Sequence, residues 1–527
     1  MTTPTGLRRG AAALALAAGL AGCAGRGAFP ARPAPGALPA GSPLRSATLA
    51  EGDAWLRHYL MAGDHESALR LLDAGARTAP RDELVRRLQL GVVLHQAGRY
   101  AASDEALDWA EREAEDRITR SVARAAGSLL VNDGVLEYVP PPAERAMIPY
   151  YRMLNHLALG DRAGAAVEAR KAGALPAGRE PGEGCAGEAL LPWLSGMVYG
   201  AAGERNDALV SLRRAERAFD GCAGEGPAAP PTLGADLLHA AEGLGIRELA
   251  NSARARYGLA AEPAGRSAEL TVLVEHGWVA HRTGEELHVP VFPEELEALE
   301  GEDDDEGAGS AAARITARFL GNLGEQAAWG SAFDDHPAAR WAATLSGGHV
   351  LKLAWPEYRL EASRPAAVRL LVDDTAAAAA PVEDVSGWVV RDFEGRRAML
   401  LARAVGRGVL KLVAARGLER KAEKEGGEAA GYVVGRLASL AGNALEQADT
   451  RSWSLLPDRV SLAKVALAPG EHRVRIEVER GAGEAPDTVE LGTVTVRPGE
   501  RVVLSRRVWG ADPGGAAPLR RRRPRRF

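Results

Sequence analysis

The residues best suited to chemistry in this 527-residue chain are histidines and carboxylates that gather in one short stretch. They are Glu275, His276, His281, Glu285, Glu286 and His288. Imidazole and carboxylate groups are the ligands of catalytic zinc sites, which would make the chain a hydrolase. However, the histidines are spaced by five and seven residues, which places neighbours on opposite faces of a strand, and no H-E-x-x-H motif occurs. The spacing therefore favours structural roles over a metal site.

A second acidic set lies further along the chain and consists of Asp373, Asp374, Glu383 and Asp384. Paired carboxylates can act as general acid and base, but these fall on expected loops, where carboxylates commonly stabilise turns. The sequence also lacks a phosphate-binding G-x-x-x-x-G-K-[ST] loop and a G-x-S-x-G nucleophile motif. We therefore predict a protein that is not an enzyme and needs no cofactor or metal. An envelope hydrolase or metalloenzyme using the C-terminal half is the alternative.

Cys23 has the most specific predicted chemistry. It follows the tripeptide Leu-Ala-Gly and ends a leader in which two arginines precede twelve apolar or small residues. Such a run is too short to cross a bilayer, which takes ~20 residues, and is typical of a signal peptide. The four residues match the lipobox of bacterial lipoproteins, in which the cysteine is lipidated and the chain is cut before it. We predict a signal peptide over residues 1–22 and, because Ala24 follows, an outer-membrane lipoprotein facing the periplasm.

The two remaining cysteines, Cys185 and Cys222, lie in identical GCAGE pentapeptides on either side of an expected helical hairpin. The periplasm is oxidising, so these residues are candidates for a disulfide. The alternative is two unpaired thiols in glycine-rich loops.

Charge excludes one class of partner. The formal net charge is −5, yet six arginines crowd the last eight residues: Arg520, Arg521, Arg522, Arg523, Arg525 and Arg526. The rest of the chain is accordingly more acidic, which argues against binding to nucleic acid. Residues 511–527 are predicted to be a disordered basic tail, for which anionic lipid is a candidate contact.

Helix pairs are expected over residues 53–258, after a flexible tether at 23–48. Four segments place a glycine at a turn and a small residue five positions later: Gly63 and Ala68, Gly98 and Ser103, Gly160 and Ala165, Gly203 and Ala208. Glycine takes the positive φ of such a turn at no cost, and the small residue allows close helix packing. This is the tetratricopeptide (TPR) pattern. Such arrays offer a groove to a protein partner; the alternative is that the helices only support the second half.

One block in this array resembles a known family. It begins with Asn132 and Asp133 and continues through YYRMLNHLALGD at 150–161 to VEARK at 167–171. The block is similar to that of uncharacterised bacterial outer-membrane lipoproteins with TPR-like helices, and the likeness extends to 272–277 and 449–470. The family-motif residues are Asn132, Asp133, Tyr150, Tyr151, Asn155, Gly160, Asp161, Glu168 and Arg170. The resemblance implies a role in the cell envelope, in association with outer-membrane lipoproteins that activate peptidoglycan synthases.

Alternating apolar and polar residues predict strands in the second half. We expect a mixed α/β region over 266–450, with a solvated acidic loop at 300–310, and a small β-sandwich-like module over 451–510. The predicted fold class is α+β, with a TPR-like α-solenoid before this strand-rich half. The predicted function is a lipid-anchored periplasmic scaffold that binds a protein partner, in the control of cell-envelope or peptidoglycan synthesis. A component of an outer-membrane secretion or polymer-export system is a further alternative.

Overall fold

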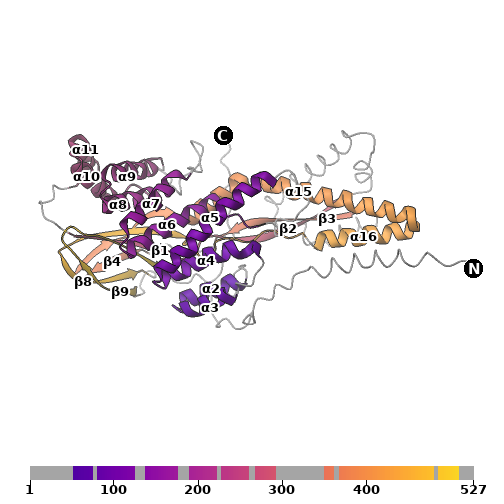
Figure 1. Ribbon diagram of the computed structural model, residues 1–527, viewed down its shortest axis with the longest axis horizontal. Helices are drawn as coiled ribbons and strands as arrows, with labels where there is room; N and C mark the ends of the chain where they lie inside the picture. The colour runs from indigo at the N-terminus through magenta and orange to yellow at the C-terminus, as the bar shows by residue number, and fades with distance from the viewer. Residues whose placement is uncertain are drawn as a thin grey trace, which may run out of the picture.

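Figure 1 presents the computed structural model of the chain. The structure describes residues 51–74, 80–124, 137–175, 189–221, 227–259, 268–291, 349–360, 367–444, 446–479 and 485–509. Several predicted features lie outside these residues: the leader with Cys23, the tether, Asn132 and Asp133, Cys185 and Cys222, the acidic loop and the basic tail.

Five helix pairs make up the described N-terminal part. They are α2 (Glu51–Met61) with α3 (His65–Ala74), α4 (Glu83–Gln96) with α5 (Tyr100–Arg124), α6 (Pro142–Ala158) with α7 (Arg162–Ala174), α8 (Leu190–Ala202) with α9 (Arg205–Asp220), and α10 (Pro231–Gly243) with α11 (Arg247–Tyr257). A 3₁₀ turn, η3 (Pro80–Asp82), precedes α4. The predicted TPR-like helix pairs are confirmed.

The turns within these pairs have the expected geometry. Gly63, Gly98, Gly160 and Gly203 have φ between 71° and 83°, the left-handed region that favours glycine. The small residues five positions later are all buried, and Ser103 Oγ donates a hydrogen bond to Gly91 O at 2.7 Å. A Cβ at Gly91 would lie 2.5 Å from Leu107 Cδ2, so the glycine permits α4 and α5 to approach this closely.

The strands form two four-stranded sheets and one strand pair in the described residues. The first sheet has the order β10 (Arg501–Val508), β1 (Ala268–His276), β7 (Arg459–Leu467), β6 (Ala380–Asp384); the second has β5 (Thr375–Ala378), β4 (Val368–Val372), β8 (Gly470–Val478), β9 (Asp487–Val496). β1 pairs in parallel with β10 and antiparallel with β7.

The two four-stranded sheets form a sandwich with a shared apolar core. Val272 and Ala463 of the first sheet belong to the same buried cluster as Leu370 and Ile476 of the second. Strands on both sides of residue 451 contribute to each sheet. The strands expected as a small module over 451–510 are therefore part of a larger sandwich that also includes β1, β4, β5 and β6.

A separate arm extends from the sandwich. β2 (His281–Val291) pairs antiparallel with β3 (His349–Arg359), and both run beside α15 (Val385–Gly426) and α16 (Glu428–Ala444), as Figure 1 shows. A Cβ at Gly408 of α15 would lie 2.7 Å from Leu353 Cδ2 of β3, so helix and strand are in close contact.

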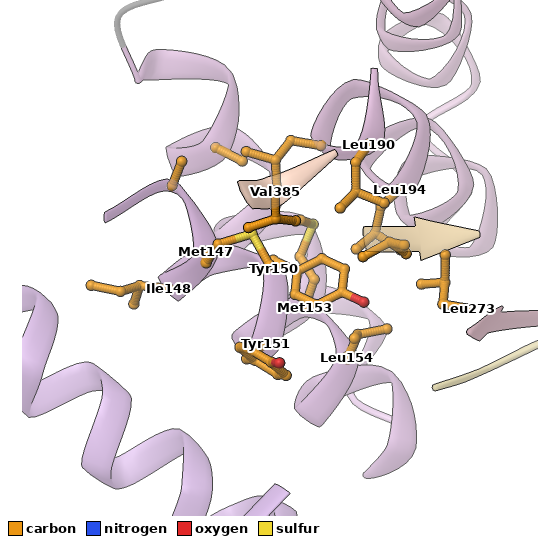
Figure 2. Close-up of a cluster of buried hydrophobic side chains, with 14 of the residues drawn as sticks. Met147, Ile148, Tyr150, Tyr151, Met153, Leu154, Leu190, Leu194, Leu273 and Val385 are labelled. Atoms are coloured by element: carbon orange, nitrogen blue, oxygen red, sulfur yellow. The ribbon is translucent and has the colours of Figure 1, made fainter. Parts of the chain in front are cut away.

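The main hydrophobic core joins the helices to the strands. Side chains of α6 gather with Leu190 and Leu194 of α8, with Leu273 of β1 and with Val385 at the start of α15 (Figure 2). Leu273 and Val385 are fully buried in this cluster. The helical array and the sandwich are thus packed on each other through a continuous core.

Candidate functional site

The first helix of each pair faces the strand-rich half. Arg57 of α2 donates hydrogen bonds to Ser454 O at 2.7 Å and Val279 O at 3.3 Å. Gln89 of α4 donates to Ser454 Oγ at 2.9 Å. In TPR-like arrays the concave, partner-binding surface is lined by the first helices. The surface on which we expected a partner is therefore covered, at these helices, by the chain's own strand-rich half.

Further along the array, the same contact is made by a buried ion pair. Asp236 of α10 accepts hydrogen bonds from Lys464 Nζ of β7 at 2.7 Å and from Trp193 Nε1 of α8 at 2.8 Å. The side chains of Asp236 and Lys464 are 2% and 5% exposed. A pair this deeply buried fixes the relative position of its two elements, because separating the two charges would leave each one buried without a counter-charge.

Glu275 is the centre of a buried polar cluster between α6 and the sandwich. Tyr150 and Tyr151 of α6 donate their hydroxyl hydrogens to its two carboxylate oxygens at 3.0 and 3.2 Å. Arg507 of β10 places Nε 3.2 Å from Glu275 Oε2. Burial and the nearby carboxylate raise the pKa of both tyrosines well above the usual range, so both remain protonated donors. The tyrosine pair of the family-like block therefore holds the helices on the first sheet.

A chain of hydrogen bonds runs beside this cluster. His95 Nδ1 lies 2.7 Å from Asn155 Oδ1, and His95 Nε2 lies 2.8 Å from Ser505 Oγ. Because Asn155 Nδ2 donates to Ser103 Oγ, the Asn155 oxygen is the acceptor, and His95 carries its hydrogen on Nδ1. His95 Nε2 then accepts from the Ser505 hydroxyl.

Burial lowers the pKa of His95, so the ring is neutral in the fold. The order serine, histidine, asparagine is that of a nucleophile, a base and an orienting group. In this protein the chain of hydrogen bonds continues through Ser103 to the carbonyl of Gly91, so each member is satisfied by the next. This arrangement is typical of a buried network that fixes the position of helices against a strand.

The remaining residues of the family-like block stabilise the array itself. Arg152, buried, contacts Glu168 at 3.2 Å and also Asp104 and Glu111. Although burial alone would lower it, these carboxylates raise the pKa of Arg152 above the usual range. Asp161 caps α7 by accepting from Gly164 N at 2.9 Å, directly after the Gly160 turn.

Arg170 is exposed on the outer helix α7 and pairs with Glu204 at 2.7 Å. This contact links the third helix pair to the fourth. The side chains of the family-like block that the structure describes thus connect helices to one another or to the sandwich.

Those members of the histidine and glutamate set that the structure describes do not come together as a metal site. His276 Nε2 contacts Ser461 Oγ at 3.0 Å, and burial lowers the pKa of His276 to about 4. Glu286 pairs with Lys352 at 2.7 Å, while His281 is 1% exposed. The side chain of His288 and its surroundings lie outside the described residues. Within the described part of the chain, no three His, Cys, Asp or Glu side chains are grouped so as to hold a metal ion.

The second acidic set serves turns and helix starts. Asp373 lies between β4 and β5 with a φ of 50° and accepts from Arg473 N at 2.9 Å. Asp384 caps α15 by accepting from Gly387 N at 2.9 Å. Asp374 is exposed, and Glu383 is buried with one oxygen accepting from Asp384 N. The structure separates these carboxylates into local roles.

A cavity of about 680 Å³ opens beside the Glu275 cluster. Its lining comes from the turns of the first two helix pairs at 60–63, 65, 95–98 and 100, from Glu275 and Val478, from the start of β9 at 487–489, and from β10 and the next residue at 505–509. Among these residues, His95, Ser505 and Arg507 also belong to the buried networks. Ligand-binding sites are usually concave and combine an apolar lining with a few convergent polar groups.

Sequence reasoning missed the contribution of β10. Ser505 and Arg507 occur in an ordinary alternating strand, and only their contacts with α4 and α6 distinguish them. The one sequence feature that relates them is their spacing of two residues, which places both side chains on the same face of the strand.

These observations define the chain as an α+β protein in which a TPR-like helical array is packed on a β-sandwich. Over the residues described, no helix is long and apolar enough to cross a membrane. The sequence matches no protein-family model and no curated protein.

Comparison with solved structures finds partial likenesses. A crystal structure of MamA is 16% identical, with 41% of this chain and 100% of that chain covered and a TM-score of 0.26. MamA 41-end from Desulfovibrio magneticus RS-1 is 15% identical, with coverages of 40% and 94% and a TM-score of 0.26. BtubC from P. vanneervenii is 17% identical, with coverages of 40% and 82% and a TM-score of 0.28. These TM-scores are too low to support an assignment of fold or function. The TPR-like description is based instead on the helix pairs and their glycine turns.

Proposed function

We propose that this chain is a lipid-anchored outer-membrane scaffold that binds a protein partner at the cavity between the first two helix-pair turns and β10. The lipobox ending at Cys23 supports the anchor, and the oxidising periplasm is the compartment in which the described part would lie. The resemblance to envelope lipoproteins favours a partner involved in cell-envelope or peptidoglycan synthesis. The function is binding rather than catalysis.

The observation that carries this proposal is the position of the cavity. The first helices of the array are engaged by the chain's own strand-rich half, through Arg57, Gln89 and Asp236. The cavity instead opens where the turns at Gly63 and Gly98 approach β10. A partner placed there contacts the array and the sandwich together, which suits a scaffold whose two parts share one core.

The proposal is tested by crosslinking in living cells, with a photoreactive residue at one position at a time. Ala62 and Thr488 are exposed and line the cavity, whereas Val167 is 46% exposed on the outer helix α7. We expect a specific adduct from positions 62 and 488 and none from position 167. Adducts from all three positions alike, or from neither cavity position, would contradict the proposal.

The identity of the adduct decides between partner classes. A peptidoglycan synthase or one of its lipoprotein activators would support the envelope-synthesis role. An outer-membrane channel would favour the secretion or polymer-export role in its place.

A further inference from the structure

Strand β10 has one side without a strand partner in the described structure. It is the last strand in the order of its sheet and pairs only with β1. Glu269 N donates to Glu500 O at 2.9 Å, and Gly277 N donates to Val508 O at 3.1 Å. Because alternate residues of a parallel strand form bonds on opposite sides, the even-numbered residues of β10 face β1.

Ser505 and Arg507 consequently direct their backbone N–H and C=O groups to the other side. Both residues line the cavity, together with their neighbours on the same strand. The stretch 505–508 spans about 13 Å as an extended strand. The cavity therefore contains a row of backbone donors and acceptors of the kind that an added strand pairs with.

The charge at this edge is positive. Arg506 is exposed, lines the cavity and has no ion pair or hydrogen bond within the described residues. The neighbouring arginine, Arg507, is already neutralised by Glu275. Asp487, the carboxylate on the β9 side of the cavity, takes part in an interaction of its own. Among the residues that the structure describes, the Arg506 guanidinium thus has no ion-pair partner beside the free strand edge.

His65 and Arg506 line the same cavity from opposite parts of the fold. Burial is the main cause that lowers the pKa of His65, and the positive charge of Arg506 lowers it further. His65 starts α3, so the edge of β10 and the first helix-pair turn enclose the same space.

We propose that the cavity binds an extended segment of a partner protein, which adds as a strand to β10 and places an acidic side chain against Arg506. The backbone groups of Ser505 and Arg507 supply the pairing, and the guanidinium supplies the preference for a carboxylate. This inference rests on the proposed function and specifies how the partner is bound.

Peptides provide the test, because the binding mode predicts which peptide atoms matter. A displayed library of random linear peptides is selected on the full chain in detergent micelles, and the most enriched peptide is synthesised with a fluorophore for anisotropy titration. Single N-methyl groups are then placed at each position in turn. We expect N-methylation to reduce affinity at least about tenfold at alternate positions and to have little effect at the positions between them, because only every second N–H of the peptide faces β10.

The charge component is tested with a matched pair of variants. Arg506→Gln removes the cation at the cavity. Arg497→Gln removes an exposed arginine in the turn between β9 and β10. We expect about a tenfold loss of affinity for Arg506→Gln and no change for Arg497→Gln. Replacing the acidic residue of the peptide by its amide should give the same loss, and the two changes together should not add.

Three results would overturn the inference. They are a library from which no peptide is enriched, an N-methyl scan without alternation, and equal effects of the two arginine variants. A partner that still crosslinks from positions 62 and 488 under any of these results would leave the proposed function standing and remove only the strand-addition mode.

Discussion

Replacing Glu275 by Gln should destabilise the helical array and the sandwich together. The side chains of Glu275 and Arg507 are 2% and 3% exposed, and they pair at 3.2 Å. The amide keeps the size of the side chain and an acceptor for a tyrosine hydroxyl, but it leaves the Arg507 charge buried without its counter-charge. Breaking a buried pair from one side costs about 3–5 kcal/mol, a large part of the ~5–15 kcal/mol that a domain has.

The assay is urea unfolding followed by two probes of the same samples. Far-UV circular dichroism reports mainly on the helices. Tryptophan fluorescence reports on all ten tryptophans, among them Trp278 and Trp453, which are buried beside the sandwich. For Glu275→Gln both midpoints should fall by the same amount, because the cluster joins the two parts. Glu471→Gln, at an exposed glutamate of β8, is the control and should leave both midpoints unchanged.

The reasoning would be refuted by a fluorescence midpoint that falls while the helical midpoint stays in place. Such a result would mean that the array is stable without the sandwich. Tyr150→Phe and Tyr151→Phe provide a second measure, since each removes one hydrogen bond to Glu275 and should cost about 1 kcal/mol.

Three further predictions follow from single positions. Burial holds the pKa of His276 at about 4, against 6.5 in the unfolded chain. The free energy of unfolding should therefore fall by about 3 kcal/mol as the pH drops from 6.5 to 4, and it should stay level above pH 6.5. His276→Gln should remove this part of the pH dependence of the urea midpoint; an unchanged slope would contradict it. Gly91→Ala places a methyl group against Leu107 and should cost about 1–3 kcal/mol, seen as a lower melting temperature, whereas Gly173→Ala, in open space on α7, should not destabilise. A fluorophosphonate probe should not label Ser505, because its hydroxyl and His95 belong to a structural network; labelling that is lost in Ser505→Ala would instead favour the hydrolase alternative.

Features set by neighbouring residues could be predicted from the sequence. The turn at Gly98 and the buried Ser103 are five positions apart, and the conformation of the turn needs nothing from the rest of the chain. The four strands after residue 459 follow in the same way from alternating apolar positions. Which sheet each strand joins does not follow, because alternation indicates a buried face but not the partner strand.

The candidate site depends on contacts between distant parts of the sequence. His95 and Ser505 are 410 residues apart, and Arg57 reaches Ser454 across 397 residues. β10 lies beside β1 although the arm and most of the sandwich separate them along the chain. No local pattern specifies such pairings, so the cavity and the free edge of β10 could be found only in the folded protein.

The polar residues buried between array and sandwich bear on where a partner can bind. An array whose first helices were open to a partner would gain little from burying Asp236, His95 and Tyr150, because each buried polar group costs free energy unless it is matched. In this protein each is matched by the sandwich, through Lys464, Ser505 and Glu275. Displacing the strands to open the groove would leave all of these groups unpaired at once, at several kcal/mol for the ion pair of Asp236 and Lys464. A partner therefore gains more by adding to the free edge of β10, where the outward backbone groups of Ser505 and Arg507 have no strand partner within the described residues.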